Sequence, residues 1–508
     1  MKRYTDLEYL KLSKINRFFY KLLSFFCAIP LKIWGVIKSV GKIIANFSKK
    51  IAMSFVEIFT TFKNGSWKTR VSYVIMGFGN ISRGQIIRGT LFLIFELAFI
   101  FYMVFAGVHW ISQIGTLGTR GPEEVYNPIY DSFTTVKHDN SFKILLYSVL
   151  SIFFIIAFIY TWRLNIKQNK IADEILAKGK KLKSGKDDLK SLLDDQFHKT
   201  LLALPTIGII VFTVLPIVFM ILIAFTNYDG AHDGYNNKLF TWVGWENFGT
   251  IINWAGADGS VYSIAFGEVL TWTLIWAFFA TFSNYFLGMF VAILINKKGI
   301  KLKKLWRTIL VLTIAIPQFI SLIYVSKMFA NDGIVNGFLL KHFGFTHEFF
   351  GTPTSARITV IVINIWIGIP YLMLIATGIL MNIPEDLYES AKIDGANVWQ
   401  QYTKITLPYM LFITGPYLLT SFIGNMNNFN VIYLLSGGNP VNSEASSAAG
   451  AVGYTDLLVT WLFKITTGTE AKYYMASVIG VLIFVVVAVL SAIIYNILPS
   501  NKNEEDYQ

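Results

Sequence analysis

Two sets of neutral polar side chains are spaced so that each would share one face of a helix inside an apolar stretch. Asn364, Gly368 and Tyr371 follow the i, i+4, i+7 spacing of such a face. The same spacing recurs at Ser421, Asn425 and Asn428. Amides and hydroxyls that can meet the hydroxyls of a sugar, together with an aromatic ring and no charge, suit a polyol pathway. Interhelical hydrogen bonding, with close packing through Gly368, is the alternative. The spacing alone favours neither.

The apolar stretches contain very few charged residues. Glu96 and Lys327 lie well inside them. Those near their ends are Lys143, Arg163, Glu268 and His109. Proton- and sodium-driven carriers usually place acidic or histidine relays at mid-membrane, so this pattern disfavours a secondary carrier. We interpret Glu96 as a helix contact or a snorkelling group.

The sequence offers no indication of an enzyme or of a cofactor site. The single cysteine, Cys27, excludes an intramolecular disulfide and a cysteine-rich metal site. Residues 179–186 approach the pattern of a phosphate-binding loop, but their glycines are one residue too far apart. Asp187 also stands where Ser or Thr would bind magnesium. We therefore expect no catalytic residue, metal, cofactor or nucleotide site in this chain, and no nucleic-acid partner.

A polar stretch at 382–410 lies between two apolar ones and has the signals of a helical hairpin. Pro384 fits the first turn of a helix, and Gly395 supplies its C-terminal stop. A second short helix is predicted from about Val398, ending at Leu407-Pro408. Because a mere connection would need only a few residues, this stretch is predicted to dock a partner.

The spacing inside this stretch resembles the coupling loop of ABC-importer permeases. That pattern is Glu-Ala-Ala, three residues, Gly, nine residues and Ile-x-Leu-Pro, and the one departure here is Ser390 in place of Ala. The matching residues are Glu389, Ser390, Ala391, Gly395, Ile405, Leu407 and Pro408. The resemblance implies that the loop sits in a cleft of an ATPase subunit and passes its motion to the membrane helices. A capped helical hairpin without a particular partner is the alternative.

The composition is that of a polytopic membrane protein. Of 508 residues 54% are apolar, and the mean hydropathy is +0.52. Eight stretches are long enough to cross a bilayer as helices: 91–111, 142–163, 201–226, 267–296, 308–330, 358–381, 410–432 and 473–497. We therefore predict an all-α fold with about eight transmembrane helices.

The charge distribution predicts that both termini are cytoplasmic. With that orientation the cytoplasmic segments hold 34 lysine and arginine residues, and the opposite loops hold 5. Membrane proteins carry an excess of lysine and arginine in their cytoplasmic loops, and this asymmetry matches that rule.

Residues 1–90 are predicted to be a basic amphipathic region on the cytoplasmic membrane surface. Basic residues recur every three or four positions from Lys11 to Lys21, with apolar residues on the other side. A proline and a lysine interrupt the apolar run 22–37, so we favour an interfacial helix over a span there.

The chain order follows from these predictions. It comprises the N-terminal region 1–90, the first two spans within 91–163, a charged cytoplasmic linker 164–200, the third span 201–226, a short outer loop 227–266, a transmembrane core 267–497 that contains 382–410, and a cytoplasmic tail 498–508.

Three further motifs resemble sugar-importer permeases. They lie at 223–228, 243–248 and 453–458. Together with the coupling loop and the eight spans, they resemble the larger permease subunit of maltose and maltodextrin ABC importers. The resemblance implies a type I importer fold in a bacterial cell membrane. It also implies a second related permease, a pair of ABC ATPases that hydrolyse the ATP, and an extracellular sugar-binding lipoprotein as partners, beside the membrane lipids.

The resemblance also implies where the sugar binds. In that family it lies mid-membrane against two motifs that match 364–371 and 424–428 here. The residues carried over by position are Asn364, Ile367, Gly368, Tyr371, Gly424, Asn425 and Asn428. Gly424 replaces an aromatic residue, and Ile314 and Gln318 stand where the family has Tyr and Ser. A roomier site, suited to longer maltodextrins, would fit these departures.

Three alternatives stay open. The same machine could carry another oligosaccharide or a polyol. The chain could be a secondary sugar carrier, which the uncharged spans disfavour. It could also be a structural or regulatory membrane protein whose hairpin binds something other than an ATPase.

Overall fold

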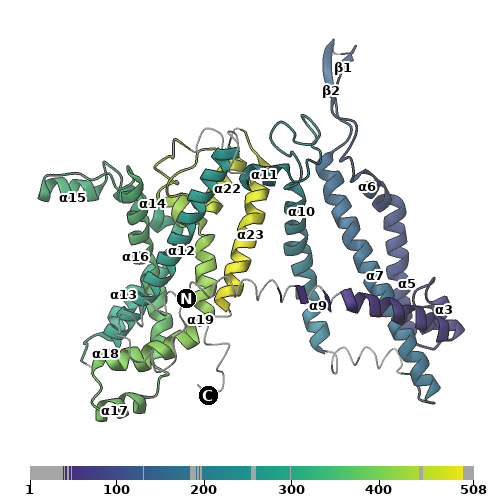
Figure 1. Cartoon of the computed structure of the whole chain (residues 1–508), viewed down its shortest axis with the longest axis horizontal. Coiled ribbons are helices and arrows are strands. Elements are labelled where there is room, and N and C mark those ends of the chain that lie inside the picture. The colour runs from purple at the N-terminus through teal and green to yellow at the C-terminus, as the bar shows by residue number, and fades with distance from the viewer. Residues whose placement is uncertain are drawn as a thin grey trace, which may run out of the picture. The chain divides into compact units, whose positions relative to one another are not determined.

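The computed structural model describes residues 48–495 and a few positions before them (38, 41–42 and 45–46), with gaps at 130, 183–189, 191–193, 195–196, 253–258, 298, 445–449 and 469. The predictions for 1–37, including the question of 22–37, and for the tail 498–508 lie outside the described residues. The chain divides into two compact units, Met1–Gly244 and Trp245–Gln508. Figure 1 labels their elements.

Unit 1 is built on three long apolar helices. They are the continuous helix of α5 (Ile86–Tyr102), η1 (Met103–Gly107) and α6 (Val108–Gln113), then α7 (Ser141–Ala177), and the helix of α9 (Phe197–Ile209), η2 (Ile210–Val214) and α10 (Leu215–Ile223). A cluster of buried side chains that includes Leu117, Leu145 and Phe240 joins them. α7 runs well beyond the predicted span 142–163, so the first part of the linker 164–200 is helical.

One β-hairpin interrupts the predicted all-α fold. β1 (Glu123–Asn127) pairs antiparallel with β2 (Ser132–Val136), with Val125 opposite Thr134. The hairpin extends past the ends of the unit 1 helices (Figure 1). Its β-branched and aromatic residues favour extended backbone, which the sequence interpretation overlooked because it treated 112–141 only as a loop.

Residues 66–89, with the short helices α3 (Trp67–Val71) and α4 (Phe78–Ile81), are fastened to α7 by buried polar groups. Arg83 lies 2.6 Å from Asp173 and also donates to Asn169. Glu96 is buried and accepts the Met76 N–H at 2.8 Å. This side chain of α5 therefore bonds the turn between α3 and α4, and it does not snorkel.

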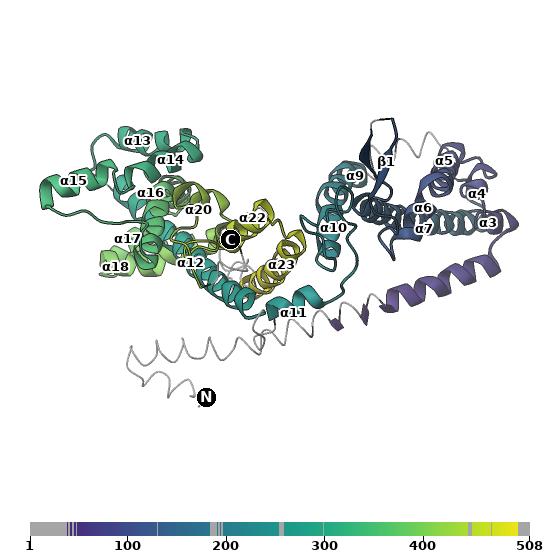
Figure 2. The same cartoon turned by 90° about the horizontal axis from the view of Figure 1, so that it is seen from above.

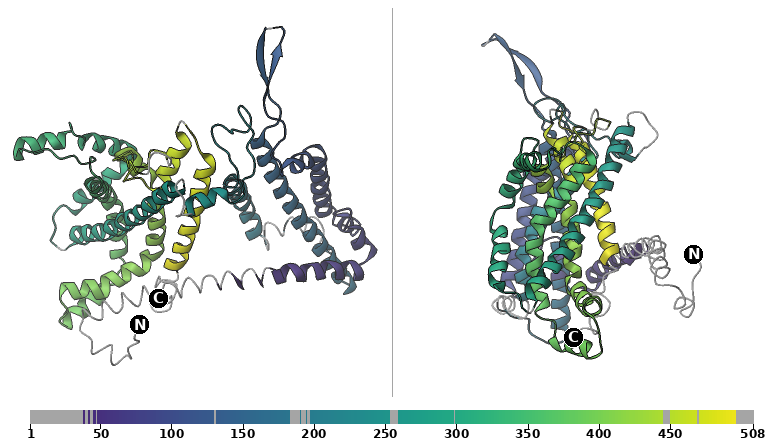
Figure 3. Two further views of the ribbon diagram at one scale, coloured as in Figure 1. Left: turned by 45° about the horizontal axis from the view of Figure 1, so that its top comes forward. Right: turned by 90° about the vertical axis from the view of Figure 1, so that its left-hand side faces the viewer.

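Unit 2 contains the remaining helices. They are α11 (Glu246–Ile252), α12 (Gly259–Asn296), α13 (Lys303–Ala315), α14 (Gln318–Met328), α15 (Ile334–Phe343), α16 (Pro353–Leu380), α17 (Glu385–Ile393), α18 (Val398–Gln401), η3 (Tyr402–Thr406), α19 (Leu407–Met426), α20 (Phe429–Leu435), α22 (Leu458–Thr467) and α23 (Tyr473–Tyr495). The long helix α12 packs most extensively against α16 and next against α19. Trp276 and Met289 of α12 each lie in one of the two buried clusters of this unit. Figure 3 shows α17 and α18 at one end of the unit and α11 and α22 at the other.

Within the described residues, seven helices are long and apolar enough to cross a membrane, or eight if one bent pair counts as a span. The bent pair is α13 and α14, which meet at 92°. This bent pair occupies the predicted span 308–330. Pro317 lacks an amide hydrogen and disfavours helical backbone at Ile316, which is extended.

The predicted span 410–432 is also divided. α19 ends at Met426, and the side chain of Asn428 accepts the Val431 N–H at the start of α20. Asparagine side chains compete with helical hydrogen bonds in this way. Asn428 therefore does not continue the helical face that begins at Ser421.

Candidate functional site

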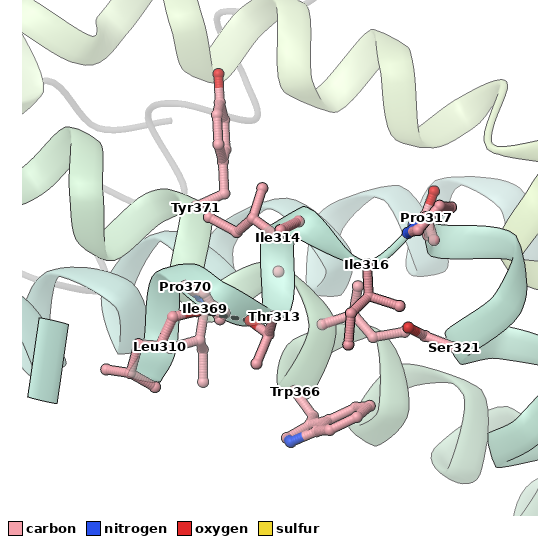
Figure 4. A pocket seen from close by; sticks show the side chains of 14 residues that line it. Leu310, Thr313, Ile314, Ile316, Pro317, Ser321, Trp366, Ile369, Pro370 and Tyr371 are labelled. Carbon is pink, nitrogen blue, oxygen red and sulfur yellow. Dashed lines mark hydrogen bonds between the residues drawn. The ribbon is translucent and has the colours of Figure 1, made fainter. Parts of the chain in front are cut away.

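A cavity of about 610 Å³ lies where the bent pair meets α16 in unit 2. One wall is formed by the end of α13 and the break at 313–318. The other wall is the segment 366–371 of α16. Figure 4 shows the side chains of Ile314, Ile316, Trp366 and Tyr371 around this space. Irregular backbone at membrane depth is expected only beside protein or a polar cavity, so the break and the cavity belong together.

The lining of this cavity carries no charged side chain. Most of it is aliphatic or aromatic, and the polar side chains are those of Thr313, Gln318, Ser321 and Tyr371. Tyr371 is 51% exposed and its ring centroid lies 6.4 Å from that of Tyr417 on α19. An uncharged ligand with apolar faces and a few hydroxyls fits such a surface.

Some of the sequence-predicted residues of α16 line the cavity, and others pack against neighbouring helices. Ile367, Gly368 and Tyr371 line the cavity. Gly368 also permits a close approach of α12, because a Cβ there would overlap the amide of Asn284. Gly368 therefore lies both in the cavity wall and at a close contact between α16 and α12.

Asn364 lies one turn before Gly368 and is buried. Its Nδ2 and the Oδ1 of Asn284 have no hydrogen-bond partner within the described part of the chain. An unpaired buried amide is costly, by about 1–3 kcal/mol. A polar partner would relieve that cost. Asn284 was not singled out from the sequence, although it too is a mid-span amide.

The second predicted motif lies outside the lining of the cavity. Asn425 on α19 donates from Nδ2 to Thr281 of α12 at 3.0 Å, and its main-chain oxygen accepts the Trp276 indole N–H. Asn428 lies within 3.4 Å of the Asn425 side chain. Gly424 faces open space, since a Cβ there would meet nothing within 4 Å. The two motifs are thus held to neighbouring turns of α12, at Thr281 and Asn284.

The predicted turn at Gly395 is confirmed. Gly395 has φ +78° and donates to Lys392, while Ala396 donates to Ala391. These two bonds are the Schellman pattern that ends a helix at a glycine. Asn397 then caps α18 through a reciprocal capping box with Gln400.

The predicted end of the second helix is wrong. α18, η3 and α19 form one continuous helix from Val398 to Met426, and Leu407 and Pro408 lie within it. The wider turn of η3 accommodates Pro408, which cannot donate to the ladder. Because α18 and α19 belong to one helix, a displacement of α18 would move α19 as well.

Three of the seven predicted coupling residues line a depression of about 340 Å³ between α17 and α18. Ala391, Gly395 and Ile405 line it. Glu389 and Ser390 are exposed, and Leu407 and Pro408 are half-buried. Three large apolar side chains that the sequence interpretation missed are strongly exposed on this hairpin: Ile393 (87%), Val398 (82%) and Trp399 (70%). Such a cluster marks a surface for a partner.

Comparison with known proteins agrees with this arrangement. The family model of binding-protein-dependent transport system inner membrane components matches residues 284–502. The maltodextrin permease MalC of Streptococcus pneumoniae is 33% identical over 449 residues, which are 86% of this chain and 97% of MalC. The chain belongs to the family of binding-protein-dependent transport permeases.

Two other relatives of this permease come from Bacillus subtilis. The maltodextrin permease MdxF is 32% identical over 85% of this chain and 95% of its own length. The galactooligosaccharide permease GanP is 31% identical over 82% of this chain and 93% of its own length. A bacterial alginate ABC transporter chain is a similar solved structure, with a TM-score of 0.49, 21% identity, and 62% of this chain and 99% of that chain covered. The family match includes the cavity, the hairpin of α17 and α18 and the last part of α12, from Asn284 onward.

Proposed function

We propose that this permease is a subunit of an ATP-driven ABC importer that takes up maltose and maltodextrins. The observation that carries the proposal is the uncharged cavity of about 610 Å³ at the α13–α14 break, with Tyr371 at its edge. Two relatives that the chain matches over most of its length are maltodextrin permeases, which supports this substrate class.

The sugar path would run between α16 and α19. Tyr371 would stack on a pyranose ring, and the amides of Asn364, Asn425 and Asn428 would meet sugar hydroxyls. Ile367 and Gly368 would line the path, and Gly424, which has open space beside it, would leave it wide. The Nδ2 of Asn364, which has no hydrogen-bond partner within the described residues, is compatible with such a contact.

The permease would work with other subunits. A pair of ATPases would bind the hairpin at Glu389–Ala391, Gly395 and the exposed Trp399, and would hydrolyse the ATP. A second related permease would complete the path, and an extracellular sugar-binding lipoprotein would deliver the sugar. The cytoplasmic side of the cell membrane would hold the hairpin and both termini, in agreement with the charge asymmetry.

Another oligosaccharide is the second candidate, because GanP is a galactooligosaccharide permease of nearly equal similarity. The decisive experiment is uptake of labelled maltotriose by a host without its own importer that expresses this chain with its partner subunits. Uptake should require ATPase and binding protein, and unlabelled maltotetraose should compete better than galactobiose. Stronger competition by galactobiose would transfer the proposal to galactooligosaccharides. Uptake by the chain without an ATPase would refute an ABC mechanism.

A further inference from the structure

A second cavity, of about 330 Å³, lies in unit 1 between the helix at 48–64 and α7. Three cationic side chains of α7 line it, those of Arg163, Lys167 and Lys170. Their i, i+4, i+7 spacing places them on one face of the helix. The opposite wall includes Ser54 and Thr61.

The charges on this cavity do not cancel. Glu57 is the one carboxylate in its lining, and it pairs with Lys170 at 2.9 Å. The hydrogen bond from Lys170 lowers the pKa of Glu57, so the carboxylate stays ionised. Three cations and one anion leave the lining with a net charge of +2.

A buried hydroxyl on the wall formed by the helix at 48–64 has no hydrogen-bond partner within the described residues. Thr61 is 6% exposed, and its Oγ1 has no hydrogen-bond partner within the described part of the chain. Buried hydroxyls are normally satisfied. A ligand oxygen in the cavity would supply what Thr61 lacks.

The helix at 48–64 has the geometry of a helix that lies in the membrane surface. It runs across the end of α7 rather than along it (Figures 1 and 2). An exposed apolar stripe follows one side of it: Ile51, Phe55, Phe59 and Phe62. With 3.6 residues per turn, this stripe lies about a quarter turn from the side that carries Ser54 and Thr61. One side thus faces α7 while the next can enter the bilayer.

The end of this helix is fixed in place. The Arg70 guanidinium donates to the main-chain oxygens of Phe62 and Lys63 at 3.1 and 2.8 Å, and the Tyr73 hydroxyl donates to that of Ile58. The cavity is therefore held open by contacts outside it, and does not depend on a ligand to form.

We propose that this cavity binds the phosphate headgroup of an anionic phospholipid. The phosphate oxygens would accept from the Arg163 guanidinium, the Lys167 ammonium and the Thr61 hydroxyl, and the acyl chains would lie along Phe55 and Phe59. Basic pockets beside transmembrane helices at the cytoplasmic surface suit such headgroups. A neutral sugar would gain nothing from two uncompensated cations. The apolar stripe beside the cavity favours a lipid over a free phosphate.

The experiment measures lipid retention by the full-length chain purified in detergent. After exposure to equal amounts of phosphatidylglycerol and phosphatidylcholine, native mass spectrometry should find phosphatidylglycerol retained in excess. The double variant Arg163→Gln/Lys167→Gln should retain several-fold less. The matched control is Lys178→Gln/Lys180→Gln, which removes the same charge from the end of α7 and beyond, outside the cavity lining. Equal losses in both double variants would overturn the site.

Two further arms decide between a site and its alternatives. Thr61→Val keeps the shape of the side chain but removes its hydroxyl, so it should weaken phosphatidylglycerol retention. The unfolding temperature of the purified variant without lipid should equal that of the wild type, which shows that it is folded. Unchanged retention would remove Thr61 from the site and overturn the proposal as stated. Phosphatidylglycerol should raise the unfolding temperature, and inorganic phosphate at millimolar concentration should not. If phosphate alone gives the full shift, the ligand is a free anion and the lipid proposal fails.

Discussion

The hydroxyl groups of Tyr388 and Thr406 lie 2.8 Å apart. This hydrogen bond joins the middle of α17 to the last residue of η3, and so links the two arms of the hairpin. Thr406 is buried and directly precedes α19, so this bond braces α17 against the start of the membrane helix. Rigidity of this kind is what transmission of motion from an ATPase would require.

We predict that Tyr388→Phe uncouples ATP hydrolysis from sugar uptake in part. Loss of a neutral hydrogen bond costs about 1 kcal/mol. This corresponds to a roughly fivefold change in the equilibrium between hairpins in which α17 is held against η3 and hairpins in which it is released. The measurement is the amount of sugar imported per ATP hydrolysed in proteoliposomes. Thr403→Val is the control, because the Thr403 hydroxyl bonds only within its own helix. A similar decrease in both variants would argue against a bracing role for Tyr388.

A second prediction separates the conformation of Gly395 from its bulk. A Cβ at this position would meet nothing within 4 Å in the chain itself, but φ is +78°. Valine should strain the turn, at a cost of at least about 1–2 kcal/mol, whereas asparagine tolerates this backbone. Gly395→Val should therefore weaken co-purification of the ATPase and stop uptake, and Gly395→Asn should retain much of both. If both variants fail equally, close approach of the ATPase, rather than the turn, requires glycine here.

The sequence predicted local features well where one residue decides them. Gly395 was expected to end a helix, and it does so with the expected backbone. Pro317 carried an equally clear signal for a break in the helix, but hydropathy does not report the 92° change of direction that follows it. The contact between Gly368 and Asn284 depends on how α12 packs on α16, which no spacing within one segment reveals. The same holds for the cavity beside Thr61, whose walls are about a hundred residues apart in the chain.

The third prediction concerns orientation. The hairpin β1–β2 and the hairpin α17–α18 are predicted to lie on opposite sides of the membrane, with α17–α18 in the cytoplasm. In a Cys27→Ser background, Ile129→Cys should react with an impermeant maleimide in intact cells. Ile393→Cys should react only after the membrane is opened. Both positions are more than 80% exposed, so access and not burial decides the labelling. Labelling of Ile393→Cys in intact cells would reverse the orientation.

The last prediction concerns the sugar path. Tyr371 lines the uncharged cavity with half of its side chain exposed, so its removal should leave the fold intact. Tyr371→Ala should abolish stacking on the sugar, at a cost of about 1–2 kcal/mol by analogy with other aromatic contacts. The apparent KM for maltotriose uptake should rise about tenfold, while assembly with the partner subunits stays unchanged. Tyr324→Ala is the matched control, because Tyr324 is a more exposed tyrosine on α14 outside the cavity lining. Wild-type uptake by Tyr371→Ala would move the sugar to another surface of α16 or α19, and would remove the main support for Asn364 and Asn428 as its ligands.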